Sequence, residues 1–110
     1  MDKLINSLLS PDAYDHPVSD ICLQETHISW VILTGDYAYK IKKPVNFGFV
    51  DFSSLARRRH FCDEEIRLNS RLAPDIYLEV VAIHEGNEHS AVTGSGNIVE
   101  YAVKMRQFPA

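Results

Sequence analysis

The sequence predicts an α+β domain: an antiparallel sheet with one long helix inserted between its strands. Three observations support this fold class. Short runs rich in β-branched and aromatic residues occur on both sides of residues 53–72. Residues 37–43 alternate along the chain as a strand with two distinct faces does. Residues 53–72 themselves carry the start and stop signals of a helix.

The first residues are expected to form a short helix over 2–9. Four apolar side chains there share one helical face: Leu4, Ile5, Leu8 and Leu9. Pro11 ends this helix or begins a second short turn, and Pro17 marks a boundary. We therefore divide the chain into an N-terminal helical segment, 1–16, and a main domain, 17–110.

Three strands are predicted in the first half of the main domain. A short one is expected within 18–24. Residues 28–33 form a nearly continuous apolar run, typical of a buried strand. Residues 34–36, Thr-Gly-Asp, form a tight turn, and the alternating run at 37–43 follows. The last two strands are therefore expected to form a hairpin.

The long helix is expected over 53–72, after a loop at 44–52. Ser53 or Asp51 is expected to cap its start, and Pro74 closes it. The loop carries three aromatic residues around a glycine: Phe47, Phe49 and Phe52.

The second half of the domain completes the sheet. Residues 77–83 are a predicted strand, and 85–88 a turn across which 90–92 pair back. After a flexible connection at 93–97, an alternating strand is expected over 98–105. The helix would cover one sheet face. The other face has no evident cover in the sequence, which points to a partner or a ligand cleft.

Composition excludes several classes of protein. The net charge of −4 and pI near 5.6 disfavour a nucleic-acid-binding module, whose footprint is basic. No window approaches the roughly 20 apolar residues that a membrane helix needs, and no secretory signal begins the chain. Two cysteines without a C-x-x-C pair suit a reducing compartment, so we expect a cytoplasmic protein. The histidines and cysteines show no metal-ligand spacing, so no metal site is expected.

Ala38 and Lys40 are the first candidate for chemistry. Strand alternation places them on one sheet face, roughly 7 Å apart. A small residue two positions before a lysine leaves space for a flat ring, and the ammonium can reach phosphates beyond it. Protein kinases use such a strand lysine. The alternative is that Lys40, Lys42 and Lys43 form a solvated edge.

Glu65 is the second candidate. Its helical neighbours are mostly apolar, in a stripe expected to face the sheet: Phe61, Cys62, Leu68, Asn69 and Leu72. An unpaired carboxylate is costly in such a place, so Glu65 needs a cation, and Lys40 is the natural one. The alternative is a helix-edge acid paired with Arg58 or Arg71. The basic run at 57–59 is expected to be a solvated face, with anion binding or partner docking as the alternative.

The sequence resembles the bacterial aminoglycoside-phosphotransferase-like proteins, in which a kinase-like domain is often fused to a P-loop ATP-binding domain. The resemblance begins near Asp15, covers nearly the whole chain from there, and is carried by these segments: 25–31, 34–45, 51–53, 62–65, 68–69, 71–74, 77–78 and 103–109.

The resemblance implies a protein-kinase-like small lobe that binds ATP. Lys40 matches the phosphate-contacting strand lysine, and Glu65 matches its helix partner. Four residues match the hinge, where backbone groups meet adenine: Met105, Arg106, Gln107 and Phe108. Two features depart from the pattern. No glycine-rich loop precedes the hairpin, since residues 24–29 occupy its place. The large lobe, with the acids that bind magnesium and perform catalysis, is absent from the 110 residues.

Two functions follow as expectations. The first is the nucleotide-binding small lobe of an ATP-dependent small-molecule phosphotransferase, part of a longer protein and inactive without its large lobe and magnesium. The second is a non-enzymatic module, built on the same lobe, that binds a partner or self-associates through its uncovered sheet face. The negative net charge disfavours a third function, in which the basic helix binds nucleic acid.

Overall fold

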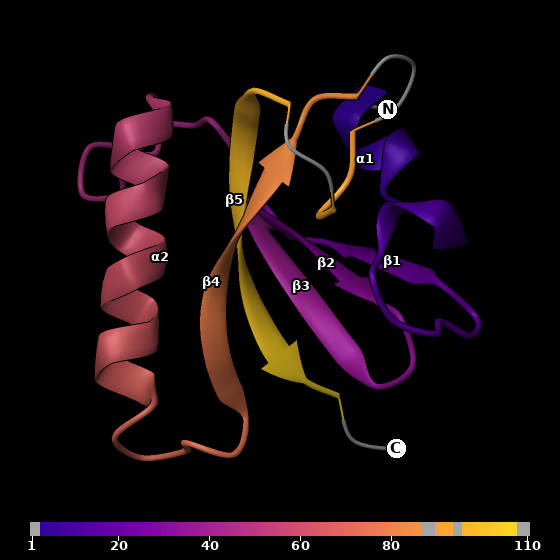
Figure 1. The fold of residues 1–110 in the computed structure, drawn as a ribbon. Helices are drawn as coiled ribbons and strands as arrows, with labels where there is room; N and C mark the ends of the chain where they lie inside the picture. Colours follow the sequence, from indigo (N-terminus) through magenta and orange to yellow (C-terminus); the bar gives the residue numbers. More distant parts are fainter. Residues whose placement is uncertain (1–2, 87–89, 94–95, 108–110) are drawn as a thin grey trace.

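The computed structural model describes residues 3–86, 90–93 and 96–107. Two short helical elements come first, and five strands and one long helix follow (Figure 1). In chain order the elements are α1 (Lys3–Ser7), the 3-10 turn η1 (Pro11–Ala13), β1 (Cys22–Glu25), β2 (Ser29–Leu33), β3 (Tyr37–Lys42), α2 (Leu55–Asn69), β4 (Tyr77–His84) and β5 (Ile98–Arg106).

The five strands form one antiparallel sheet in the order β1-β2-β3-β5-β4. The predicted α+β class and the helix inserted between strands are therefore confirmed. The last strand, β5, lies between β3 and β4, which places Met105 opposite Ala38 and Val103 opposite Lys40. The predicted return strand at 90–92 is reduced to a single bridge between His84 and Ala91. The predicted turn at 85–88 lies partly outside the described residues.

The N-cap of helix α2 is Ser54, one residue after Ser53 and three residues after Asp51, the two predicted caps. The hydroxyl of Ser54 accepts a hydrogen bond from the backbone N–H of Arg57 at 3.2 Å, which makes Ser54 the N-cap. Asp51 instead accepts hydrogen bonds from the N–H and hydroxyl of Ser53, and so stabilises the turn before the helix. The predicted caps were therefore wrong. Asp51, Ser53 and Ser54 all have side chains that can cap a helix, but only Ser54 directly precedes the first turn.

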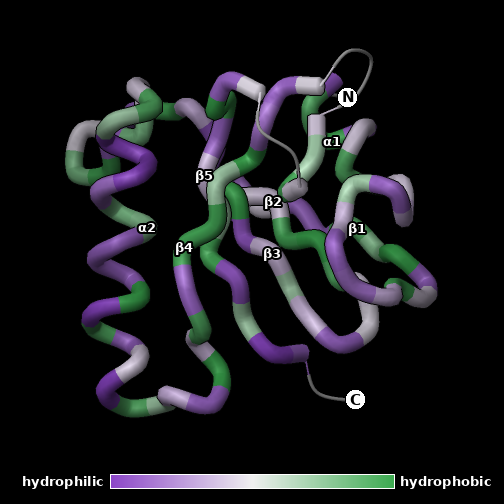
Figure 2. The backbone as a smooth tube through the Cα atoms, in the orientation of Figure 1, coloured by the Kyte–Doolittle hydropathy of each residue, from purple (hydrophilic) through white to green (hydrophobic). Residues whose placement is uncertain are grey.

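The sheet-facing side of α2 is not the expected apolar stripe. The buried residues of the helix are Arg58 and Cys62, whereas Leu68 and Leu72 of the predicted stripe are 52% and 88% exposed. Figure 2 shows α2 as a largely hydrophilic helix beside the more hydrophobic strands. Among the described residues, no helix has the length and apolar character needed to cross a membrane.

The main apolar core lies on the opposite face of the sheet. Alternation in β3 directs Tyr39 and Ile41 away from α2, and both are buried there. Ile5, Leu8 and Tyr14 of the N-terminal segment pack into the same cluster, on the far side of the sheet from α2 (Figure 1). The expectation that this face has no cover within the sequence is therefore wrong: residues that precede the first strand provide it.

Truncating Leu8 tests whether the N-terminal segment belongs to this core. Leu8 is 1% exposed, so we expect Leu8→Ala to lower the free energy of unfolding by about 2–5 kcal/mol. The control Leu72→Ala removes the same atoms at an exposed position and is expected to change it by less than about 0.5 kcal/mol. Urea denaturation measures both. Equal effects of the two substitutions would contradict a core role for the segment.

Candidate functional site

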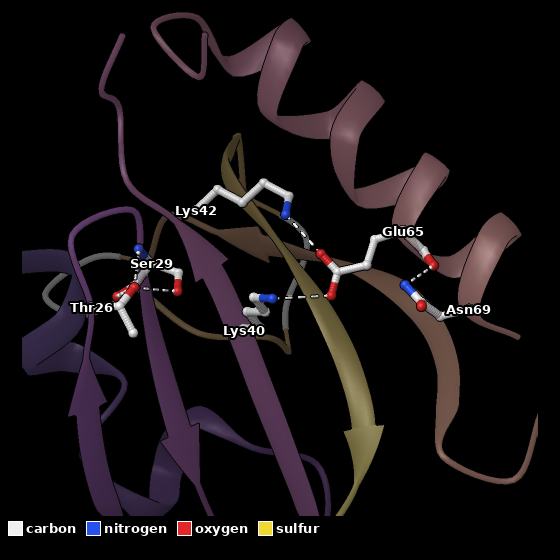
Figure 3. Close-up of polar contacts among 6 residues, drawn as sticks. All are labelled: Thr26, Ser29, Lys40, Lys42, Glu65 and Asn69. Atoms are coloured by element: carbon white, nitrogen blue, oxygen red, sulfur yellow. Dashed lines mark hydrogen bonds and ion pairs between the residues drawn. The ribbon is translucent and has the colours of Figure 1, made fainter. Parts of the chain in front are cut away.

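Two lysines of β3 and one glutamate of α2 form a charged cluster between sheet and helix (Figure 3). The ammonium of Lys40 donates to Oε2 of Glu65 at 3.3 Å, and that of Lys42 donates to Oε1 at 2.8 Å. Alternation along β3 brings both lysines to the face on which α2 lies. The predicted contact between Lys40 and Glu65 is confirmed, and Lys42 joins it.

Lys42 is the more enclosed of the two lysines. Its side chain is 8% exposed, compared with 31% for Lys40 and 14% for Glu65. Its ammonium also lies 5.0 Å from the centre of the Phe52 ring, within the range of a cation–π contact. Lys42 was not among the predicted site residues, although strand alternation places it on the same face as Lys40.

Glu65 is ionised in this environment. Burial of the carboxyl favours its neutral form, but the hydrogen bond and charge of Lys42, followed by those of Lys40, outweigh burial and lower the pKa of Glu65. The pKa of the nearby Cys62 thiol shifts in the opposite direction to that of Glu65, because burial raises it to about 11. Cys62 is therefore a packed thiol and not a reactive thiolate at neutral pH.

Arg58 does not pair with Glu65, which excludes one alternative partner. Its Nε donates to both carboxylate oxygens of Glu100 on β5, at 3.0 and 3.1 Å, and Nη1 donates to the carbonyl of Phe52 at 2.8 Å. The two charged side chains are only 11% and 6% exposed. This buried ion pair attaches the first half of α2 to the sheet.

The rest of the basic run is surface. Arg57 lies 3.4 Å from Asp51, and Arg59 lies 4.0 Å from Asp63, with both arginines more than half exposed. Arg67 pairs with Glu64 on the same helix at 2.6 Å. Arg57 and Arg59 fit the solvated face predicted for 57–59. The prediction is wrong for Arg58, because its side chain faces the sheet and is buried against Glu100.

A groove of about 710 Å³ opens beside Lys40. Val31, Lys40 and Met105 from three adjacent strands line it, together with Tyr77. The turn at 26–29 and the aromatic loop form its edges, with Phe47 and Phe49 51% and 91% exposed. Most of the lining is apolar, and the ammonium of Lys40 is its cationic group.

Ala38 lies on β3, on the same sheet face as Lys40, as predicted. It is buried at 6% exposure and is paired with Met105 across the β3–β5 ladder. Its small side chain adds no bulk beside Met105 at this end of the groove.

The turn at the place of a glycine-rich loop is closed on itself. The hydroxyl oxygen of Thr26 accepts from the backbone N–H of Ser29 at 3.0 Å (Figure 3). It also accepts from the N–H of Ile28 at 3.3 Å, and the N–H of Thr26 donates to the Ser29 carbonyl. These N–H groups are therefore used within the turn and are not presented to a phosphate.

The predicted hinge residues are also tied into the fold. The N–H of Arg106 donates to the Ile76 carbonyl at 2.8 Å, and the N–H of Gln107 donates to the Asp36 carbonyl at 2.9 Å. The Gln107 side-chain oxygen accepts from the N–H groups of Thr34 and Gly35, both at 3.0 Å, and so holds the hairpin turn. The backbone N–H groups of Arg106 and Gln107 are therefore occupied within the fold.

Phe108, the fourth predicted hinge residue, lies outside the described residues. Within the described part of the chain, no group of three or more histidine, cysteine, aspartate or glutamate side chains is placed to hold a metal ion.

Comparison with known proteins identifies relatives without a described function. An uncharacterized protein of Mycobacterium bovis and uncharacterized proteins of two strains of Mycobacterium tuberculosis are each 40% identical to the chain over 96 residues, or 84% of its length. The matched region is 18% of each relative, so the chain spans less than a fifth of their length. No protein-family model and no solved structure matches the chain.

Removal of the Arg58 charge tests the attachment of α2. Because Arg58→Met leaves the Glu100 carboxylate buried without its arginine, we expect a loss of about 3–5 kcal/mol in the free energy of unfolding. Arg59→Met, at an exposed site one residue away, is expected to cost less than about 1 kcal/mol. Urea denaturation of both variants is the measurement. A small effect of Arg58→Met would show that this pair does not hold the helix.

Acid titration tests the state of Glu65. Since its folded-state pKa is lowered, Glu65 contributes stability that is fully present above the ordinary glutamate pKa of about 4.3 and is lost as pH falls through the lowered value. The stability difference between the wild type and Glu65→Gln should therefore shrink below about pH 4.3. Asp51 and Glu64 also have lowered pKa values, because of hydrogen bonds with Ser53 and Arg67. Both carboxylates are present in the wild type and in Glu65→Gln, so their contributions cancel in the stability difference. A difference that stays constant from pH 7 to 3 would contradict an ionised, lysine-bound Glu65.

Proposed function

We propose that the chain is the nucleotide-binding small lobe of an ATP-dependent small-molecule phosphotransferase with a kinase-like fold, similar to the aminoglycoside-phosphotransferase-like proteins. In this proposal the chain binds ATP and does not transfer a phosphoryl group by itself.

The observation that carries the proposal is the ion pair between Lys40 and Glu65 at the edge of the groove. In protein kinases, a lysine on the third strand contacts the ATP phosphates and pairs with a glutamate on the following helix. Here Lys40 lies on β3 and Glu65 on α2, the next element. A strand lysine that pairs with a largely enclosed helix glutamate and faces a groove is the arrangement in which protein kinases place their phosphate-contacting lysine.

The groove supports the adenine half of the proposal. Its volume falls within the range of roughly 300–1,000 Å³ that is common for small-molecule sites, and such sites are mainly apolar with few polar groups. Val31 and Met105 offer apolar walls for a flat ring, and Lys40 lies among them as the phosphate contact.

The self-closed turn at 26–29 places a limit on phosphate binding. Because Thr26 occupies the N–H groups of Ile28 and Ser29, Lys40 would be the main phosphate contact supplied by this chain. Phosphoryl transfer also needs magnesium ligands and a residue that orients the acceptor. The 110 residues contain no segment that resembles those motifs, so magnesium and catalysis would require acids outside this chain.

A second candidate function is a partner-binding or self-associating module on the same lobe. The observation in its favour is the exposure of Phe47 and Phe49 at the rim of the groove. The N-terminal segment covers the sheet face that the sequence left open, so this loop is the stronger candidate surface. Sedimentation at rising concentration separates the two functions: self-association abolished by a Phe47→Ser, Phe49→Ser double substitution would favour the module.

Titration with a non-hydrolysable ATP analogue, followed by NMR, tests the proposed function. We expect shifts at Lys40 and Met105 and about tenfold weaker binding in Lys40→Met, which loses a charge-assisted contact to phosphate. Lys104→Met is the matched control, because Lys104 lies on the opposite sheet face, where its ammonium contacts the Tyr37 ring. No ATP hydrolysis is expected from the chain alone. Unchanged spectra at saturating analogue, or equal affinity of wild type and Lys40→Met, would overturn the proposal.

A further inference from the structure

The strand register gives the groove two ends, with Lys40 between them. Ala38 of β3 is paired with Met105, so the end proposed for the base lies two residues before Lys40 along β3. Val31 of β2 is paired with Lys40, and the turn at 26–29 leads into β2, so this turn lies on the other side of Lys40. A nucleotide with its base at Met105 and a phosphate at Lys40 would therefore direct its terminal phosphate towards the turn, at what we call the outer end of the groove.

The outer end contains few groups that could hold an anionic phosphate. The side chains of Phe47 and Phe49 line it without polar atoms. The Thr26 hydroxyl lies within hydrogen-bond distance of the carbonyl and hydroxyl of Ser29, at 3.3 and 3.0 Å, so both hydroxyl protons have acceptors inside the turn (Figure 3). The same oxygen of Thr26 accepts from the N–H groups of Ile28 and Ser29. Neither the hydroxyl groups nor these N–H groups are therefore free to bind a phosphate.

His27 is the remaining polar side chain at the outer end. It lies in the middle of the turn, lines the groove and is exposed to solvent. Its imidazole makes no hydrogen bond to any of the residues that the structure describes. An imidazole carries at least one N–H donor in either charge state. His27 can therefore donate to a phosphate oxygen without giving up a contact within the fold.

The charges around His27 favour an anionic ligand. Glu25 and Lys43 line a second hollow beside His27, and they form an ion pair with each other. The carboxylate of Glu25 is therefore balanced by a cation. Further along the groove, the two β3 lysines share the single carboxylate of Glu65, so that cluster has one more cation than anion.

We propose that His27 binds the terminal phosphate of the nucleotide, and that its imidazole N–H takes the place of the backbone N–H groups that a glycine-rich loop would supply. The inference rests on the proposed function for its ligand and on the free donor at the outer end for its residue. Lys40, still paired with Glu65, contacts the phosphates nearer the base, and His27 contacts the last one. A side chain of the turn thus distinguishes a nucleoside triphosphate from a diphosphate.

Affinities for ADP and for a non-hydrolysable ATP analogue test this role, because the two ligands differ by the terminal phosphate. His27→Phe keeps a ring and removes the N–H donor, whereas His27→Gln keeps an N–H donor. We expect His27→Phe to bind the analogue about tenfold more weakly than the wild type does, through loss of a hydrogen bond to a charged group. Its affinity for ADP should be unchanged, and His27→Gln should retain most of the affinity for the analogue.

His60→Phe is the matched control, because His60 is also exposed but lies on α2, beside a different hollow. We expect this substitution to change the affinity for neither ligand. NMR of the wild type gives a second readout: the imidazole signals of His27 should shift when the analogue is added and shift much less with ADP. Equal shifts with the two ligands would contradict a contact to the terminal phosphate.

Two results would overturn the inference and leave the proposed function in place. If His27→Phe binds the analogue as tightly as the wild type does, while Lys40→Met binds it more weakly, His27 does not hold the terminal phosphate. If His27→Phe loses affinity for ADP and for the analogue in parallel, its side chain maintains the shape of the groove and does not recognise that phosphate. A wild type that binds neither ligand would instead overturn the proposed function, and this inference with it.

Discussion

Buried ion pairs join helix α2 to the sheet, and the rest of the site depends on them. Its buried residues are Arg58 and Cys62, and its ion pairs to strands run from Arg58 to Glu100 and from Glu65 to the β3 lysines among the described residues. Apolar contacts tolerate sliding, whereas ion pairs and hydrogen bonds have preferred directions and distances. Losing one partner of such a buried pair is costly even where the intact pair adds little net stability. The pairs therefore determine where Glu65 lies.

The remainder of the fold leaves room for this polar interface. The apolar core is built on the other sheet face, where Tyr39 and Ile41 pack against Ile5 and Leu8 of the N-terminal segment. Since that core stabilises the strands, the face beneath α2 can carry lysines at alternate positions of β3 and a groove beside them. One strand thus serves the core with one set of side chains and the site with the other.

The features predictable from sequence were those with a local pattern. Alternation located β3 and the shared face of Ala38 and Lys40, and helical spacing directed Glu65 towards the sheet. Features that depend on long-range packing were missed: β5 between β3 and β4, and the N-terminal cover of the second face. Lys42 was missed because alternation predicts which sheet face a lysine lies on but not how buried it is. The burial of Lys42 depends on its packing beside Phe52, which the sequence pattern does not show.

If the proposed function is right, Lys40, held by Glu65, contacts a nucleotide phosphate. A crystal structure of the chain with magnesium and a non-hydrolysable ATP analogue tests it most directly. The account predicts the base between Val31 and Met105, the ammonium of Lys40 within hydrogen-bond distance of a phosphate oxygen, and Lys42 still bound to Glu65. An analogue bound elsewhere, or bound in the groove with its phosphates directed away from Lys40, would contradict it.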